Sequence, residues 1–151
     1  MNIDAISWKI LRTLQSKGRI SIKALAGKID LSIPATSERL KRLEETKVIE
    51  GYKAVISLPA VGYQVMAVIG MTTPKPDKER LVKILNKMPE VIECLHVTGQ
   101  DSYLLRVVSK DINHLEKFIE SINKYGETRT SIVMSQPIPL RSVDAIDNSI
   151  L

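Results

Sequence analysis

Polar and charged side chains recur along residues 32–45 at a spacing that would gather them on one side of a helix. At about 100° per residue, the outward side carries Pro34, Ser37, Glu38, Lys41 and Arg42. Lys and Arg donate hydrogen bonds to guanine, and a carboxylate accepts one from cytosine, so these residue types suit a helix that reads base edges. Two plainer interpretations stay open: the charges can form a solvated helix face, and Glu38 can pair with Arg42 one turn later.

Four further residues in the same part of the chain have the chemistry needed to hold phosphate. They are Ser21, Lys23, Ser32 and Lys53. Hydroxyl and ammonium groups bind the nucleic-acid backbone and fix its register without reading sequence. Together with the outward face of 32–45, they predict that the partner is double-stranded DNA.

Three short helices must position these side chains. Apolar residues recur at helical spacing in 4–16, 21–30 and 32–45, and an Asp or a Ser stands near the start of each as an N-cap. Residues 48–56 then alternate, are rich in β-branched side chains and contain Gly51 at a turn, which predicts a small hairpin. This pattern predicts a winged helix-turn-helix over residues 1–57, whose third helix enters the major groove.

The charge of the chain is divided unevenly between its two parts. Residues 1–60 hold 11 Lys and Arg against 6 Asp and Glu, whereas residues 61–151 hold 11 of each kind. The whole net charge of +5 therefore lies in the first two-fifths of the chain. Such asymmetry favours a polyanionic partner for that part, although a charge of this size can also serve solubility alone.

A different pattern begins after residues 58–63, which are interpreted as a linker. The expected elements are strands at 64–72, 91–98, 102–109 and 128–136, with helices beginning at Asp77 and Asp111. The order β-α-β-β-α-β over 64–151 predicts an α+β fold with a ferredoxin-like second domain. Because 64–72 is apolar on both faces and only two helices are expected, the second face of the sheet is expected to pack on another subunit.

The composition excludes several classes of protein. With 44% hydrophobic and 26% charged residues, the chain is not intrinsically disordered, and Cys94 as the only cysteine excludes a disulfide scaffold. No apolar stretch approaches the ~20 residues that cross a bilayer, so we expect a cytoplasmic protein without a membrane partner. His96, His114 and Cys94 are too few for a metal site, and no catalytic residue or cofactor is predicted.

Three stretches of the first domain resemble the Lrp/AsnC, or feast/famine, transcription regulators. They are Arg-Ile-Ser at 19–21, Leu-Ser-Ile-Pro-Ala-Thr-Ser-Glu-Arg-Leu-Lys-Arg-Leu-Glu at 31–44 and Val-Ile-Glu-Gly-Tyr at 48–52. The resemblance covers nearly the whole chain and implies a sequence-specific DNA-binding regulator with a C-terminal RAM-type domain. It also implies that Arg39 braces the domain or contacts phosphate. Lys47 stands where the family usually has a helix-ending glycine, so a strained left-handed residue is expected there.

The resemblance further implies a small effector, most plausibly an amino acid, bound between subunits near the loop that joins the middle strands. The matching residues in this chain are Thr98, Gly99, Gln100, Asp101, Ser102, Tyr103, Thr130 and Ser131. Gly99 would let a ligand approach the backbone, and Asp101 would hold an α-amino group. The family often has an acid directly before the tyrosine, whereas this chain has Ser102 there, and the loop can also be an ordinary tight turn.

Family members form homodimers that often assemble into tetramers or octamers, and the same is expected of this chain. Two other functions are weighed against an effector-controlled regulator. The first is an effector-free architectural protein that bends or wraps DNA. The second, which the sparse histidines and the basic first domain disfavour, is an enzyme like the sirohaem decarboxylases that resemble this family.

Overall fold

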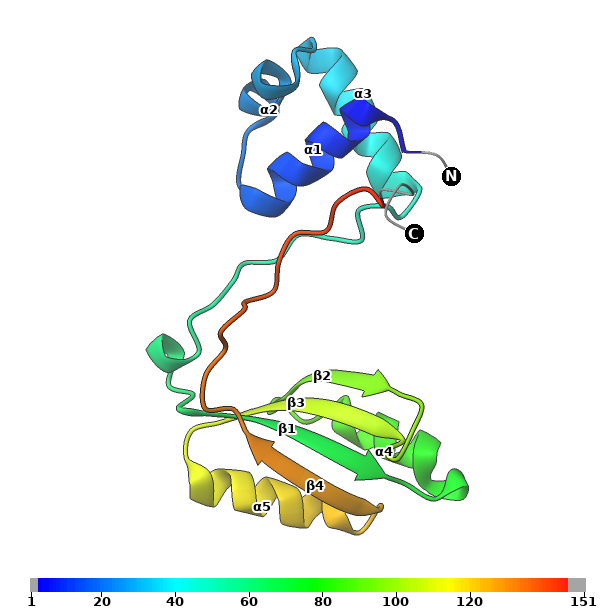
Figure 1. Ribbon diagram of the computed structural model, residues 1–151, viewed down its shortest axis with the longest axis vertical. Helices are drawn as coiled ribbons and strands as arrows, with labels where there is room; N and C mark the ends of the chain where they lie inside the picture. Colours follow the sequence, from blue (N-terminus) through cyan, green and yellow to red (C-terminus); the bar gives the residue numbers. More distant parts are fainter. Residues whose placement is uncertain (1–2, 147–151) are drawn as a thin grey trace. The chain divides into compact units, whose positions relative to one another are not determined.

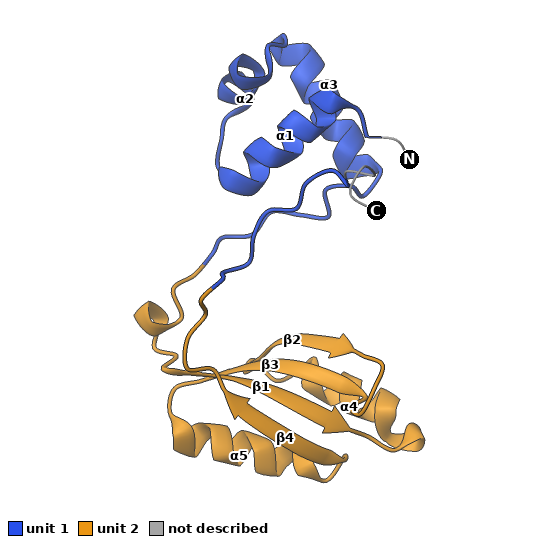
Figure 2. Cartoon of the chain, viewed as in Figure 1, with its two compact units in different colours: residues 1–55, 138–151 blue, residues 56–137 orange. Residues whose placement is uncertain are grey.

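The computed structural model describes residues 3–146 and divides them into two compact units. Residues 3–55 and 138–146 belong to the first unit, and residues 56–137 form the second (Figure 2). The predicted second domain, 64–151, therefore needs a correction at its C-terminal end, which is described below. Its last five residues, 147–151, lie outside the described part of the chain.

The first unit contains three helices: α1 (Ala5–Ser16), α2 (Ile22–Ile29) and α3 (Ile33–Glu45) (Figure 1). Each begins at the residue expected to cap it. Oxygens of Asp4, Ser21 and Ser32 accept a hydrogen bond from the backbone N–H three residues on, at 2.7, 3.2 and 3.3 Å respectively. These bonds satisfy one of the backbone donors that a helix N-terminus otherwise leaves unpaired.

One apolar stripe from each helix forms the core of this unit. Ile10, Leu25, Ile29 and Leu43 are almost completely buried, and Thr36 is buried as well, with its hydroxyl donating to the Ser32 carbonyl at 2.9 Å. After α3 the chain turns at Lys47, whose φ of 58° confirms the expected left-handed residue. Since α3 is anchored along one stripe, its opposite side is free to face a partner.

The hairpin expected over residues 48–56 is not formed, and that prediction was wrong. Val48 and Ile49 pack against the helical core, but residues 50–57 form no strand. Val55 is fully exposed, and the hydroxyl of Tyr52 donates to Glu44 at 2.8 Å. Burial and this bond to a carboxylate raise the pKa of Tyr52 to about 12. An alternating β-branched pattern makes a strand only where a neighbouring strand pairs with it, and none does so here within residues 3–146.

The C-terminal segment, residues 138–146, belongs to the helical unit because two side chains of α1 hold it. Arg12 binds the carboxylate of Asp144, and the amide of Gln15 bonds to both backbone groups of Val143. This corrects the predicted domain, which assigned the segment to the sheet. Its mixed composition carried no periodic signal that would have revealed the contact.

The second unit contains one sheet and two α-helices. Its elements are β1 (Val65–Thr72), α4 (Lys78–Leu85), β2 (Val91–His96), β3 (Tyr103–Ser109), α5 (Ile112–Asn123) and β4 (Glu127–Ile132). The strands lie in the order β2-β3-β1-β4 and every neighbouring pair is antiparallel. This confirms the predicted ferredoxin-like arrangement. Short 3-10 turns lie at Pro59–Val61, within the predicted linker, and at Lys75–Asp77.

Both helices of this unit cover the same face of the sheet (Figure 1). Ala67, Ile69 and Met71 of β1 are completely buried against Leu81 of α4 and Ile122 of α5. The alternate residues of β1 point to the other face, which none of the described helices covers. The two helices therefore cover only one of the two apolar faces expected for this strand.

Candidate nucleic-acid interface and ligand site

The outward side of α3 is a row of exposed polar and charged residues. Pro34, Ser37, Glu38, Lys41 and Arg42 are all exposed. Thr36 and Leu43, on the opposite side of the helix, are buried. Because the buried stripe fixes the rotation of α3, the five exposed side chains share one surface. The structure therefore brings together the residues that the sequence placed on one face.

The ion pair on this face is loose. Lys41 Nζ lies 3.5 Å from a carboxylate oxygen of Glu45, and the two side chains are 74% and 63% exposed. Such pairs contribute little stability and exchange readily with other charged partners. The alternative pairing of Glu38 with Arg42 does not form within residues 3–146. Lys41 and Arg42 are therefore available to an anionic partner.

Arg39 forms an ion pair within the helical unit. Its guanidinium donates to the carboxylate of Asp4 at 2.6 Å, which ties α3 to the start of α1. Asp4 also accepts from the backbone N–H of Ser7, and these hydrogen bonds hold its pKa at about 2. The Arg39 side chain remains 36% exposed, so it also keeps a surface toward solvent.

The four expected phosphate contacts lie on the same unit but on different elements. Ser21 and Ser32 cap α2 and α3 through an oxygen lone pair, which leaves each hydroxyl hydrogen free to donate. Lys23 lies exposed in the first turn of α2, next to that cap. Lys53 is exposed in the extended segment after α3, since the hairpin that would have carried it is not formed.

A second site lies where the β2–β3 loop meets β1 and β4. The carboxylate of Asp101 pairs with the guanidinium of Arg129 on β4. Both lie over Gly70 of β1, where an added Cβ would stand 2.6 Å from an Asp101 oxygen. Arg129 is the register partner of Gly70, so the glycine makes the room in which the ion pair sits on the helix-free face of the sheet.

Hydrogen bonds fix the loop that carries Asp101. Ser102 N donates to the Met71 carbonyl at 2.8 Å, and Thr72 Oγ1 donates to the Gln100 carbonyl at 3.1 Å. Gly99 has a φ of 117°, a conformation that glycine adopts without strain. Thr98, Gly99 and Gln100 are exposed at the tip. The loop is thus a fixed turn with an accessible tip.

The predicted effector residues divide between the two faces of the sheet, which corrects their grouping. Tyr103 is 8% exposed and belongs to the core under the helices, with its ring centroid 5.2 Å from that of His96. Thr130 pairs with buried Ile69 and so points to that helix-covered face from the edge strand. Ser131 pairs with Val68 and points to the same face as Arg129. Tyr103 and Thr130 therefore do not lie on the face that carries the Asp101–Arg129 pair over Gly70.

Arg129 is the residue that the sequence interpretation missed. It lies beside the predicted Thr130 but faces the opposite side, next to Asp101. Alternation along a strand shows that neighbours diverge. The sequence of neither segment alone predicts the register that places Arg129 opposite Gly70.

The remaining residues with reactive side chains do not gather. His96 lies on β2, and His114 on α5 has its Nε2 3.2 Å from a Glu90 oxygen. Within residues 3–146, no group of three or more His, Cys, Asp or Glu side chains is placed to hold a metal ion. Among the same residues, no helix is long and apolar enough to cross a membrane.

These features define a class: a helix-turn-helix DNA-binding unit joined to a four-stranded α+β ligand-binding unit. Comparison with known families agrees. The model described as "Winged helix-turn-helix DNA-binding" matches residues 3–50, and the one described as "Lrp/AsnC ligand binding domain" matches residues 66–143. The chain belongs to the Lrp/AsnC family and is a DNA-binding transcriptional regulator.

Relatives with names or structures support the same assignment. The transcriptional regulator LrpC of Bacillus subtilis is 27% identical over 136 residues, which cover 90% of this chain and 94% of LrpC. A transcriptional regulator of Neisseria meningitidis, solved in complex with L-Met, has a TM-score of 0.90 at 27% identity and covers 99% of this chain and 100% of its own. A feast or famine regulatory protein of Mycobacterium tuberculosis, complexed with L-methionine, gives 0.87 at 29%, covering 95% and 100%.

Proposed function

We propose that the exposed face of α3 enters the major groove of duplex DNA and reads base edges there. The observation that carries this proposal is the single face shared by Ser37, Glu38, Lys41 and Arg42. Lys41 and Arg42 supply donors for guanine, Glu38 supplies an acceptor for cytosine, and Ser37 serves either base or phosphate. The hydroxyls of Ser21 and Ser32, at two helix N-termini, and the ammonium groups of Lys23 and Lys53 hold phosphates and fix the register.

The experiment is a titration of the full-length chain into duplex DNA taken from around its own gene. Arg42→Ala should weaken binding by about 1–3 kcal/mol and relax discrimination against a scrambled duplex if Arg42 binds a base. Lys83→Ala is the matched control, because Lys83 is an exposed cation on α4 in the other unit. Equal affinities for wild type, Arg42→Ala and Lys41→Ala would contradict the proposed face.

The helix-free face of the sheet is the proposed homodimer interface. It presents the apolar side chains of Val68, Leu95 and Leu104 beside an ion pair between Arg106 and Glu93 at 3.2 Å. Exposed Leu95, 47% accessible, is a side chain that a second copy would cover. A two-fold dimer presents two recognition helices to half-sites about 34 Å apart. Further assembly into tetramers or octamers, and a cytoplasmic location beside the DNA, accompany this proposal.

The proposed effector is an α-amino acid bound at the Asp101–Arg129 pair. The two side chains carry the charges that match an ammonium and a carboxylate, and the Asp101 carboxylate occupies the space that Gly70 leaves above the strand. A zwitterion inserted between them would replace one ion pair by two. Exposed Thr98, Gly99 and Gln100, together with Ser102 and Ser131, supply hydrogen bonds around it. Two structural neighbours were solved with methionine, which supports this ligand class.

A melting-temperature screen against the amino acids tests this proposal. An effector at 100 times its Kd stabilises the chain by about 2.7 kcal/mol. Asp101→Asn should abolish that stabilisation while the chain remains folded, and Glu79→Gln, at an exposed carboxylate on α4 of the same unit, should retain it. An effector-free architectural protein predicts no stabilisation by any amino acid.

Control of DNA binding would follow from linkage between the two sites. An effector that binds one assembly more tightly than another shifts their populations, and so changes how recognition helices are paired. A ligand with equal affinity for both assemblies would leave DNA binding unchanged.

A further inference from the structure

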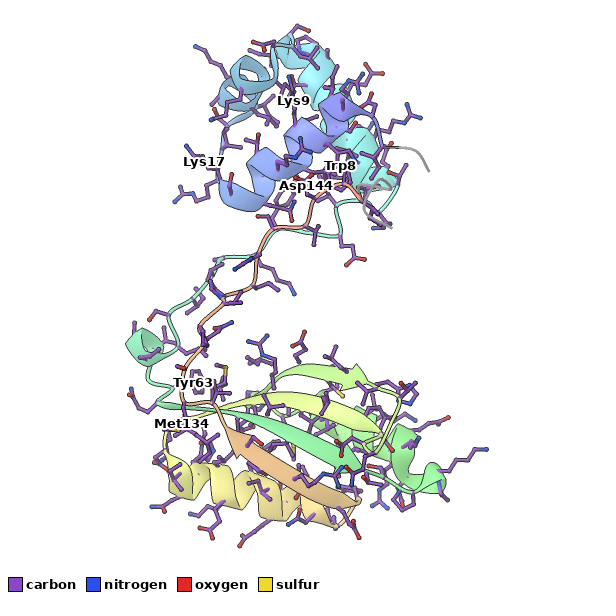
Figure 3. The ribbon with its side chains drawn as sticks, in the orientation of Figure 1. Trp8, Lys9, Lys17, Tyr63, Met134 and Asp144 are labelled. Carbon is purple, nitrogen blue, oxygen red and sulfur yellow. The ribbon has the colours of Figure 1, made fainter. Side chains whose placement is uncertain are left out.

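Helix α1 has a second face that the core does not use. Its buried stripe contains Ile10, whereas Trp8, Arg12 and Gln15 follow one another at spacings of four and three residues on another side. Trp8 is half-buried, and Figure 3 draws it with the side chains of this region. We call Trp8, Arg12 and Gln15 the outer face of α1. Val143 and Asp144, in the segment 138–146, contact its Gln15 and Arg12.

Arg12 binds the carboxylate of Asp144 on this face. Its Nε donates to both oxygens of Asp144, at 2.8 and 2.9 Å, and its Nη2 lies 2.7 Å from one of them. A planar guanidinium that engages both carboxylate oxygens fixes direction as well as distance. In agreement, Arg12 and the backbone N–H of Ala145 lower the pKa of Asp144, and Asp144 raises the pKa of Arg12.

Gln15 binds the backbone of Val143, the residue before Asp144. Its amide nitrogen donates to the Val143 carbonyl at 2.9 Å, while its amide oxygen accepts from the Val143 N–H at 2.8 Å. One side chain thus pairs with both groups of an extended residue, as a neighbouring strand would. Arg12 and Gln15 together select the register of the segment, because they bind two consecutive residues.

We propose that the outer face of α1 is a binding surface for an extended segment that presents one carboxylate, that residues 138–146 are its occupant, and that they form a strap which joins the helical unit to the chain a second time. The polypeptide crosses between the two units near residue 56 and again near residue 138. With the strap docked, both crossings constrain the helical unit. With the strap released, only the first does.

The chemistry of the contact makes the strap detachable. The side chains of Arg12 and Asp144 are 51% and 59% exposed, and Val143 and Leu140 are 69% and 94% exposed. Polar contacts rather than apolar burial therefore hold the segment. Such contacts weaken as salt screens the charges, so the strap is expected to loosen at high ionic strength.

Charge reversal in the full-length chain tests the proposal. The first readout is hydrogen exchange of the Val143 amide, which donates to Gln15, and the second is the fluorescence anisotropy of Trp8, the only tryptophan. Arg12→Asp or Asp144→Arg should speed that exchange by roughly tenfold, in line with coupling inside a hydrogen-bonded network, and should lower the anisotropy. The double reversal, Arg12→Asp with Asp144→Arg, should restore both values.

Lys28→Asp is the matched control, since it makes the same charge change on an exposed residue of α2 in the same unit. It should leave exchange at Val143 unchanged, and circular dichroism checks that each variant keeps its helices. Equal exchange rates in wild type and both single reversals would overturn the proposal. A double reversal that exchanges as fast as the singles would overturn it too.

Discussion

The surface of α3 that we propose faces DNA and the Asp101–Arg129 site are built in opposite ways. The first is carried by one helix, whose polar side chains are exposed and mostly unpaired or loosely paired. The second draws on a loop, an edge strand and a glycine in a central strand, and its two charges already neutralise each other. A partner of α3 meets a preformed surface, whereas a ligand over Gly70 must open an ion pair.

This difference predicts how each site responds to change. Single substitutions on α3 should alter affinity while leaving the fold intact, because no neighbour depends on those side chains. Substitutions near Gly70 should disturb a geometry set by strand register and close approach.

The largest effect is expected from Gly126→Ala in the sheet unit. Gly126 has a φ of 154°, and an added Cβ would overlap the backbone carbonyl of Thr72. Strain and overlap against rigid backbone should destabilise this unit by about 3 kcal/mol. The midpoint of thermal unfolding that is followed by the fluorescence of Trp8, in α1, should fall less than the midpoint measured for the sheet unit.

Gly27→Ala provides the contrasting substitution in the helical unit. Gly27 lies inside α2, and an added Cβ would meet nothing within 4 Å. Alanine should therefore stabilise α2 by roughly 0.5–1 kcal/mol. If each glycine substitution instead shifted one unfolding transition common to the whole chain, the two units would unfold as one. That result would contradict separate stabilities for the two units.

Lys47→Gly should stabilise the helical unit by about 1 kcal/mol, because glycine relieves a left-handed backbone that a side chain disfavours. Denaturant unfolding measures the change. Lys47→Ala is the control, since it removes the same charge but keeps the Cβ, and should have little effect. Equal stabilisation by both would assign the effect to charge instead of backbone conformation.

Gly70→Ala should affect amino-acid binding at the Asp101–Arg129 pair but not DNA binding by α3, with a still smaller effect on the free energy of unfolding. The added Cβ would displace the Asp101 carboxylate, which can move because it ends a flexible side chain, so the cost should stay below about 1 kcal/mol. Stabilisation by an amino acid should be lost, whereas affinity for DNA in the absence of effector should persist. Retained stabilisation by the amino acid would place the effector elsewhere.

Acid should affect α1 through Asp4. Hydrogen bonds from Ser7 and Arg39 hold the pKa of Asp4 at about 2, below its ordinary value of 3.8. The stabilisation from the charged carboxylate is therefore complete above about pH 4 and is lost as the pH falls through 2. Melting curves of wild type and Asp4→Asn should differ at pH 5 and converge at pH 2. A difference that grew toward low pH would contradict this sign.

The sequence predicted the α3 surface because a helix converts spacing directly into a face. Ser32 capped the helix as expected, and buried Thr36 and Leu43 set its rotation. The strand order also followed from the alternation of elements, since short connections allow few topologies. One continuous segment held each of these signals.

The features that the sequence did not predict depend on pairing between distant segments. Arg129 meets Asp101 only because of the register that places it opposite Gly70. Residues 48–56 have a strand pattern but no pairing strand among residues 3–146. The docking of Asp144 on Arg12 joins segments 132 residues apart. A local pattern carries none of this information.

The central claim is that Lys41 and Arg42 contact DNA, and the salt dependence of binding tests it most directly. The measurement is the slope of log affinity against log salt for wild type, for Lys41→Ala with Arg42→Ala, and for Lys83→Ala. Each phosphate contact removed should flatten the slope by about 0.9, and loss of base contacts should reduce discrimination between specific and scrambled duplexes. The account predicts one or both changes in the double variant and neither in Lys83→Ala. A double variant with wild-type slope, affinity and discrimination would contradict it.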